Sequence, residues 1–280
     1  MTVNTTSAKS LIAEQVSTVL IQPLEAASVV LSNGPTVYQS AEPLRLPTLT
    51  GGETASFVGE GEDIPETSTG FNHIDLMPSD RKSIKTLETL TKETIRQSAV
   101  GVEAALRARL VKIVADKLDS ALLGGDGADK SITGIINQAK VQKMPDADLT
   151  KPDTYLDAIA KCIANEVTPN RWFINGEDFI ALRKVKDKQD RYLLEADLTK
   201  DATYRLFGIP VVVTNKIAKG KVVLADMSQV AVVRDIAPEI QILTEAFATK
   251  GKVGIIVDTR FDLGLLHPEG VVVLTAKTTR

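Results

Sequence analysis

The longest periodic segment of the chain, from Thr91 to Leu123, places the strongest limit on the possible folds. Apolar residues recur there at every third or fourth position, which is typical of one face of an α-helix. They are Ile95, Ala99, Val102, Leu106, Leu110, Ile113 and Ala121, with Val114 and Leu118 beside them. Thr91 can cap the start of this helix, and Gly124 and Gly125 can end it. Since such a helix spans about 50 Å, the segment predicts a spine on which other elements pack.

The segment before this helix is extended and is punctuated by glycine and proline. Pieces of residues 36–77 alternate in part between apolar and polar side chains, and turn signals occur at 50–52 and 59–65. This pattern predicts an exposed β-hairpin with little core of its own. Residues 10–32 hold a short helical pattern that Pro23 interrupts, so they predict an N-terminal arm.

A second unit, with a different pattern of apolar residues, follows the helix. Residues 153–167 have helical spacing, the apolar WFIN at 172–175 predicts a short buried strand, and Asn175 can cap a helix that runs to Val185. Short β-rich runs come next, and together these elements predict an α/β unit over residues 154–233. We expect the closing strands, up to Ala276, to pack against the spine.

Composition and charge argue against several classes of protein. The 280 residues carry a net charge of −3, with 43% hydrophobic and 25% charged residues, as in ordinary globular proteins. A protein that binds nucleic acid through a general basic surface needs an excess of Lys and Arg. The net charge of −3 therefore argues against a protein of that class. The single cysteine, Cys162, has no partner for an internal disulfide, and no apolar run approaches the roughly 20 residues of a membrane-spanning helix.

The sequence holds no recognisable catalytic motif, so we predict neither an enzyme nor a cofactor site. Its two histidines, His73 and His267, lie in an alternating segment and in a turn, where surface or structural roles are expected. The glycine loop at 124–134 could cradle a phosphate, but Asp126 and Asp129 would repel an anion. A helix cap followed by a loop is therefore the favoured interpretation.

Two charged clusters are candidate binding sites. The acidic cluster in the extended segment consists of Glu60, Glu62, Asp63 and Glu66. Carboxylates suit a hard metal ion, but the spacing matches no calcium-binding loop, so an acidic tip that meets a basic surface of another chain is favoured. The run RKVKDKQDR at 183–191 has a basic excess that is typical of a solvated helix end, and an inter-subunit contact is the alternative.

The order of these segments and four local motifs resemble the major capsid proteins of tailed bacteriophages. Four motifs carry the resemblance. They are the extended loop with its entry into the spine, FVGEGEDIPETSTGFNHIDLMPSDRKSIKTLETLTKETI, the helix end LDSALLGGDGADKSITGI, the helix WFINGEDFIALRKVKDKQDRYLL and the strand LFGIPVVVTNKI. The resemblance runs discontinuously over residues 43–276. It implies an α+β, Hong Kong 97-like capsid fold with an N-terminal arm, an extended β-hairpin loop, a long spine helix, a peripheral domain sheet and an inserted α/β axial domain.

The resemblance also implies a domain division and a function. The implied parts are an arm (1–35), an extended loop (36–80), a peripheral domain (81–153 and 234–280, with the spine helix at 91–123) and an axial domain (154–233). The implied function is self-assembly through homo-pentamers and homo-hexamers into an icosahedral virion capsid, built in the cytoplasm of a bacterial host. Its expected partners are a separate scaffolding protein, a portal and packaged double-stranded DNA bound without sequence specificity, but no membrane.

In such a shell each subunit presents one surface to a different surface of its neighbour. We expect the acidic cluster to pair with basic residues next door, namely Arg183, Lys184, Lys186 or Arg191. Some family members cross-link through a lysine on the extended loop, but residues 46–80 contain none, so we predict a non-covalent shell. The chain also reaches its arm almost at once, which predicts a separate scaffolding protein or none.

Three other interpretations remain open. The nearest is an encapsulin, a cellular shell of the same fold that encloses enzymes, although the loop and strand motifs look more like those of the phage proteins. A hydrolytic or metal-dependent enzyme built on the α/β unit would need His, Asp, Glu or Cys clustered at strand ends. A monomeric binding module would leave residues 36–77 without a role.

Overall fold

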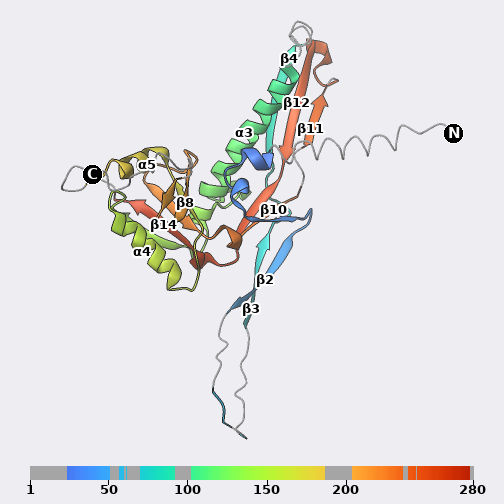
Figure 1. Ribbon diagram of the computed structural model, residues 1–280. Coiled ribbons are helices and arrows are strands. Elements are labelled where there is room, and N and C mark those ends of the chain that lie inside the picture. Colours follow the sequence, from blue (N-terminus) through green and yellow to red (C-terminus); the bar gives the residue numbers. More distant parts are fainter. Residues whose placement is uncertain are drawn as a thin grey trace, which may run out of the picture.

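The computed structural model describes residues 24–50, 57–59, 61, 70–91, 102–186, 204–235, 239–243 and 245–277. Figure 1 shows a lobe that contains α4, α5, β8 and β14, a long projection formed by α3, β4, β11 and β12, and a hairpin of β2 and β3 that extends away from both. Helices and mostly antiparallel sheets are combined in one chain, so the predicted α+β class is confirmed.

The helices and strands have the following bounds. They are β1 Thr36–Gln39, β2 Leu44–Thr50, β3 Gly70–Leu76, β4 Ile84–Thr91, α3 Val102–Gly124, β5 Gln142–Ala147, α4 Pro152–Ile163, β6 Arg171–Ile174, α5 Gly176–Arg183, β7 Arg205–Leu206, β8 Ile209–Val213, β9 Lys221–Ala225, β10 Val230–Arg234, β11 Glu239–Leu243, β12 Lys252–Thr259, β13 Phe261–Leu265 and β14 Val271–Ala276.

The lobe is built on a six-stranded sheet in the order β5-β14-β9-β6-β8-β7. Side chains alternate between the faces of a strand, and here both faces are apolar. In β6, Trp172 and Ile174 join the core beneath α4 and α5, whereas Phe173 joins the core that also contains Leu118 and Leu122 of α3. Both faces are therefore covered, one by the two short helices and the other by the end of the spine.

The described part of the spine helix buries only some residues of its predicted stripe, and the helix does not start where predicted. Leu110, Val114, Leu118 and Leu122 are all buried at four-residue spacing, while Ile113 is largely exposed and is not part of the buried face. The predicted start at Thr91 is wrong because Thr91 is the last residue of β4. The segment IKTLETLT alternates and pairs along its whole length with β12, and this pairing outweighs its proximity to the helix.

The predicted hairpin is present. Strands β2 and β3 pair antiparallel from Leu44 opposite Leu76 to Thr50 opposite Gly70, and they form a two-stranded sheet. A separate three-stranded sheet, β1-β10-β13, lies at the base of the hairpin, where Leu76 packs with Ala231 and Val233 of β10.

Local predictions in the lobe hold, and its sheet draws on distant parts of the sequence. The buried WFIN strand is β6, and the Asn175 side chain caps α5 by accepting the Glu177 N–H at 3.0 Å. Strands β5 and β14, from outside 154–233, complete the sheet, whereas β10 pairs with β1 and β13. The division into arm, loop, peripheral and axial domains stays a prediction.

Candidate assembly surfaces

The β2–β3 hairpin leaves much of its surface uncovered. In β2, Leu44 and Leu46 are half-buried while Arg45 and Pro47 are exposed. Further along the loop, Phe57 is fully exposed, at 108% of its reference area. A two-stranded hairpin is marginally stable by itself in water, so this one needs a surface on which to lie.

The outer face of the hairpin carries a solvent-exposed ion pair. Arg45 Nε lies 2.7 Å from Asp75 Oδ1, and His73 Nε2 lies 3.5 Å from Asp75 Oδ2. The hydrogen bond from Arg45 is the main reason that the pKa of Asp75 lies below its usual value. Desolvation opposes it, and the charges of Arg45 and His73 lower the pKa further. Because the pair is exposed, it fixes the register of the strands more than it stabilises the fold.

The root of the hairpin is fixed by a buried carboxylate. Asp262, on β13, is 1% exposed and accepts hydrogen bonds from the Met77 N–H at 2.7 Å and from Arg81 Nη2 at 2.9 Å. Arg81 also donates to the carbonyl of Ser131. Beside it, a Cβ on Gly264 would lie 2.6 Å from Cδ2 of Leu76, so only glycine lets β3 approach β13 this closely.

A second buried carboxylate fixes the last part of the predicted arm to the spine. Asp119, on α3, accepts hydrogen bonds from Ser28 Oγ at 2.5 Å and from the N–H groups of Val29 at 2.7 Å and Val30 at 3.1 Å. Sequence reasoning missed both Asp119 and Asp262. The available signal was a carboxylate within an otherwise apolar pattern, since a buried charge requires dedicated partners.

Three of the predicted basic residues, Arg183, Lys184 and Lys186, lie at the end of α5. The Arg183 guanidinium lies over the rings of Tyr204, at 5.4 Å, and Phe179, at 6.0 Å. Lys184 is exposed, and Lys186 follows two residues later. Glu60, Glu62, Asp63, Glu66 and Arg191 lie outside the described residues, so the structure does not test the predicted pairing.

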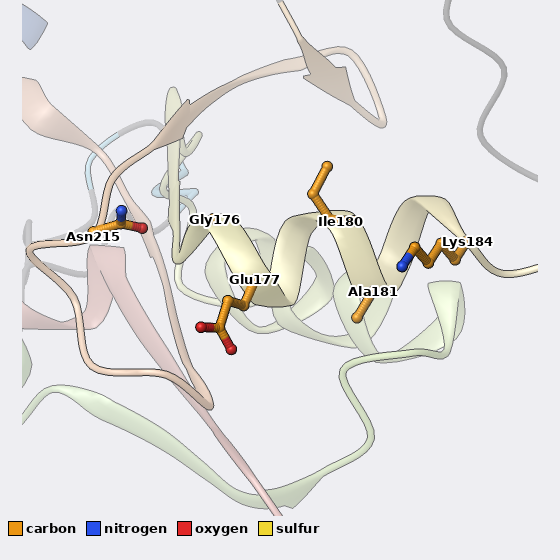
Figure 2. Close-up of a pocket in the computed structure, with 6 residues that line it drawn as sticks. All are labelled: Gly176, Glu177, Ile180, Ala181, Lys184 and Asn215. Atoms are coloured by element: carbon orange, nitrogen blue, oxygen red, sulfur yellow. The ribbon is translucent and has the colours of Figure 1, made fainter.

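Lys184 also borders an open groove of about 490 Å³ on the outer side of α5. The groove is lined by Gly176, Glu177, Ile180, Ala181, Lys184 and Asn215. Figure 2 shows Ile180 on one side of α5 and Glu177 and Ala181 on the other, with Asn215 beyond the start of the helix. The groove thus has an apolar middle and charged ends.

The potential catalytic side chains do not gather at one place. His267 is an exposed residue in a turn, and Cys162 is buried in α4, where burial and the charge of Asp226 raise the pKa of the thiol to about 11. Among the described residues no three His, Cys, Asp or Glu side chains are grouped to hold a metal ion. No helix in the part of the chain that the structure describes is long and apolar enough to cross a membrane.

Comparisons with known proteins agree with this architecture. A major capsid protein of Klebsiella oxytoca phage phiKO2 is 24% identical over 281 residues, and the match covers 91% of this chain and 63% of that protein. Among solved structures, the capsid of a native GTA particle has a TM-score of 0.71 at 18% identity, and the match covers 90% of each chain. A structure from Microbacterium phage Oxtober96 also has a TM-score of 0.71, at 17% identity, over 89% of this chain and 91% of that one.

The fold is therefore shared with these particles, as the Hong Kong 97-like prediction required. The model of the phage capsid family matches residues 8–276. Because this match takes in nearly all of the sequence, the chain belongs to the phage capsid family.

Proposed function

We propose that this chain is a major capsid protein that self-assembles through pentamers and hexamers into an icosahedral shell around packaged viral double-stranded DNA. The hairpin is the observation that carries the proposal. Its two strands pair with each other, leave apolar residues half-covered and project from the body of the subunit. Such an element gains its support from a neighbouring subunit, as it would in a closed shell.

The family match supports a structural role. The chain acts by association, without catalysis or a cofactor, in the capsid of the virion, and it assembles in the cytoplasm of a bacterial host. A separate scaffolding protein and a portal are its partners during assembly. Contacts with packaged DNA are sparse and independent of sequence, as the acidic net charge of −3 favours. The division into arm, extended loop, peripheral domain and axial domain is part of this proposal, with β5 and β14 completing the sheet of the axial domain.

The acidic cluster of the extended loop, hereafter the acidic loop, forms the predicted electrostatic contact between subunits. In this proposal Glu60, Glu62, Asp63 and Glu66 meet basic residues at the end of the α5 of a neighbour. Arg183, Lys184, Lys186 and Arg191 are the candidates for those residues. Reversing the charges of Glu62 and Asp63 weakens assembly, and added salt weakens the wild-type contact. Unchanged particles from this variant, in both low and high salt, would contradict the contact.

An encapsulin-type shell that encloses cargo enzymes is the second candidate, because it would use the same fold. The match to the phage capsid family and the similarity to the phiKO2 major capsid protein favour the phage capsid. The two candidates predict different contents. Native phage particles protect nucleic acid from nuclease, whereas native encapsulin particles contain co-purifying enzyme.

The first test is to express the chain alone and to examine it by negative-stain electron microscopy and size-exclusion chromatography. We expect closed particles, rings or tubes, held together without covalent links. Ladders of joined chains after denaturation would contradict the non-covalent shell. A chain that stays monomeric at high concentration, alone and with the scaffolding protein of its phage, would contradict the proposed function.

A further inference from the structure

Helix α4 carries an apolar stripe that the described chain leaves largely exposed. Leu156 is 46% exposed and Ile163 is 62% exposed, while Tyr155, Ala158 and Cys162 face the core. Ile159 is half-buried and Ala160 is exposed between them. These positions are three or four residues apart, so they line one side of the helix. Exposed apolar stripes of this kind mark surfaces for association.

The ends of the stripe differ in charge. Asp153 and Asp157 are exposed near the start of α4, and Lys161 is exposed near its end. None of the three forms an ion pair within the described part of the chain. The stripe thus runs from an acidic end to a basic end.

The groove on α5 runs in the same sense, from an acidic start to a basic end. Ile180, 48% exposed, and Ala181 form its apolar middle, Glu177 lies near its start, and Lys184 lies at its end. Glu177 is already 2.6 Å from Lys219, so Lys184 is the stronger free charge of the groove. A helix laid antiparallel along α5 would place its acidic start beside Lys184 and its basic end beside Glu177.

We propose that the α4 stripe of one copy of this chain packs antiparallel in the α5 groove of the next copy. Asp157 then faces Lys184, and Leu156 and Ile163 cover Ile180 and Ala181. This inference rests on the proposed function, because it assigns two surfaces of one shell subunit to each other.

The geometry suits a ring. Stripe and groove are different surfaces of the same lobe, and Figure 1 shows α4 and α5 well separated on it. The contact is therefore heterologous: each copy offers its stripe to one neighbour and its groove to the other. Repetition of such a contact around an axis closes a ring of subunits.

Two partners are now proposed for the basic end of α5. Lys184 pairs with Asp157 on α4 of one neighbour, so the remaining candidates for the acidic loop are Arg183, Lys186 and Arg191. The acidic loop is accordingly the competing occupant of the groove, and the experiment must tell the two apart.

The test is a charge-swap series on the full-length chain, with assembly followed by sedimentation velocity and electron microscopy. Asp157→Lys and Lys184→Glu should each raise the concentration needed for assembly by about tenfold or more. Each variant places two like charges opposite each other, and this repulsion is repeated at every contact of the ring. The double variant Asp157→Lys/Lys184→Glu should assemble like the wild type. Circular dichroism and thermal melting check that every variant is folded.

A mismatched pair provides the control for net charge. Asp157→Lys/Lys112→Glu has the same net charge as the rescued pair, but Lys112 is exposed on α3, outside both surfaces. This variant should stay as defective as Asp157→Lys alone. A steric variant, Ala181→Trp, fills the middle of the groove without changing charge and should also block assembly.

Each outcome leads to a distinct conclusion. Wild-type particles together with no defect in the single variants, or no rescue in the double variant, would overturn the docking and leave the proposed function intact. Rescue of Glu62→Lys by Lys184→Glu, with no rescue of Asp157→Lys, would assign the groove to the acidic loop. A wild-type chain that never assembles would contradict the proposed function, and the docking with it.

Discussion

The lobe and the hairpin are both made of β-strands, yet they are stabilised in opposite ways. In the lobe, Trp172, Phe173 and Ile174 are completely buried in consecutive positions, because helices cover both faces of the sheet. In the hairpin, the described side chains of β2 are at most half-buried, and the buried residues lie at its root. The core of the lobe is complete within one subunit, whereas the apolar residues of the hairpin are left half-covered.

The difference has a physical origin in the pattern of the strands. Continuous apolar runs such as WFI and VVVL need cover on both sides, and the subunit supplies that cover itself. The alternating segments of the hairpin need cover on one side only, and a neighbour can supply it. Stability of the subunit therefore resides in the lobe and the spine, and stability of the assembly draws on the hairpin.

The largest expected effect compares two phenylalanines. Phe173→Ala should lower the free energy of unfolding of the unassembled chain by about 3 to 5 kcal/mol, because it leaves a cavity between the sheet and α3. Phe57→Ala is the matched control in the hairpin loop, and it should change that free energy by less than about 0.5 kcal/mol, since Phe57 is fully exposed.

Two probes in the lobe can report the unfolding. Urea titrations followed by the fluorescence of Trp172, the only tryptophan, give the free energy directly. The buried thiol of Cys162, whose pKa burial raises to about 11, should react with thiol reagents at neutral pH only when the lobe opens. Equal losses from the two phenylalanine variants would remove the distinction between lobe and hairpin.

The next effect concerns the root, where the two regions join. Gly264→Val should cost about 1 to 3 kcal/mol, because its Cβ would lie 2.6 Å from Leu76 Cδ2 and 3.2 Å from Ile74 Cγ2. Gly124→Val at the end of α3 is the control, since a Cβ there meets nothing within 4 Å. Limited proteolysis and urea denaturation measure the effect, and identical behaviour of the two variants would show that the root has room to adjust.

Sequence patterns predicted the elements whose signals are local. The cap at Asn175, the buried strand at Trp172 and the hairpin itself each depend on neighbouring residues, and each is present. Strand β4 was hidden because its alternating pattern runs directly toward a helical one. Its partner β12 lies more than 150 positions away, which no local pattern could reveal.

The candidate surfaces were harder to predict for the same reason. Asp119 binds residues about 90 positions earlier, and Asp262 binds Met77 across 185 positions. The groove on α5 exists because the loop that contains Asn215 lies beside the start of the helix. The sequence can identify a cluster of charged residues. Only the packing of distant segments determines which of these side chains are buried and which stay exposed and able to contact a partner.

A smaller effect on the subunit is expected within the hairpin. Leu46→Ala should change the free energy of unfolding of the isolated chain by less than about 1 kcal/mol, because Leu46 is only half-buried. Assembly should suffer more, since a neighbour is expected to cover this face. Parallel measurements of urea stability and of the concentration needed for assembly check this. A larger loss in stability than in assembly would mean that the subunit supports its own hairpin.

The smallest effect is a dependence on pH that belongs to the hairpin. The usual pKa of an Asp carboxyl is about 4. In the folded chain the pKa of Asp75 is lower, chiefly because Arg45 donates a hydrogen bond to it. A lowered pKa means that the folded state favours the charged carboxylate. The resulting stabilisation is present above the usual pKa and is lost as the pH falls through the lower folded value.

Acid should therefore weaken the register of the hairpin through Asp75, while Cys162 in the lobe stays protonated and unaffected. Titration of the Asp75 carboxyl by NMR measures the shift, and Arg45→Gln should move the pKa back toward its usual value. Lys219→Gln is the control, because it removes the partner that lowers the pKa of Glu177 in the lobe and should leave Asp75 unchanged. If Asp75 titrates normally in the wild type, the ion pair does not form in solution and the hairpin register rests on backbone hydrogen bonds alone.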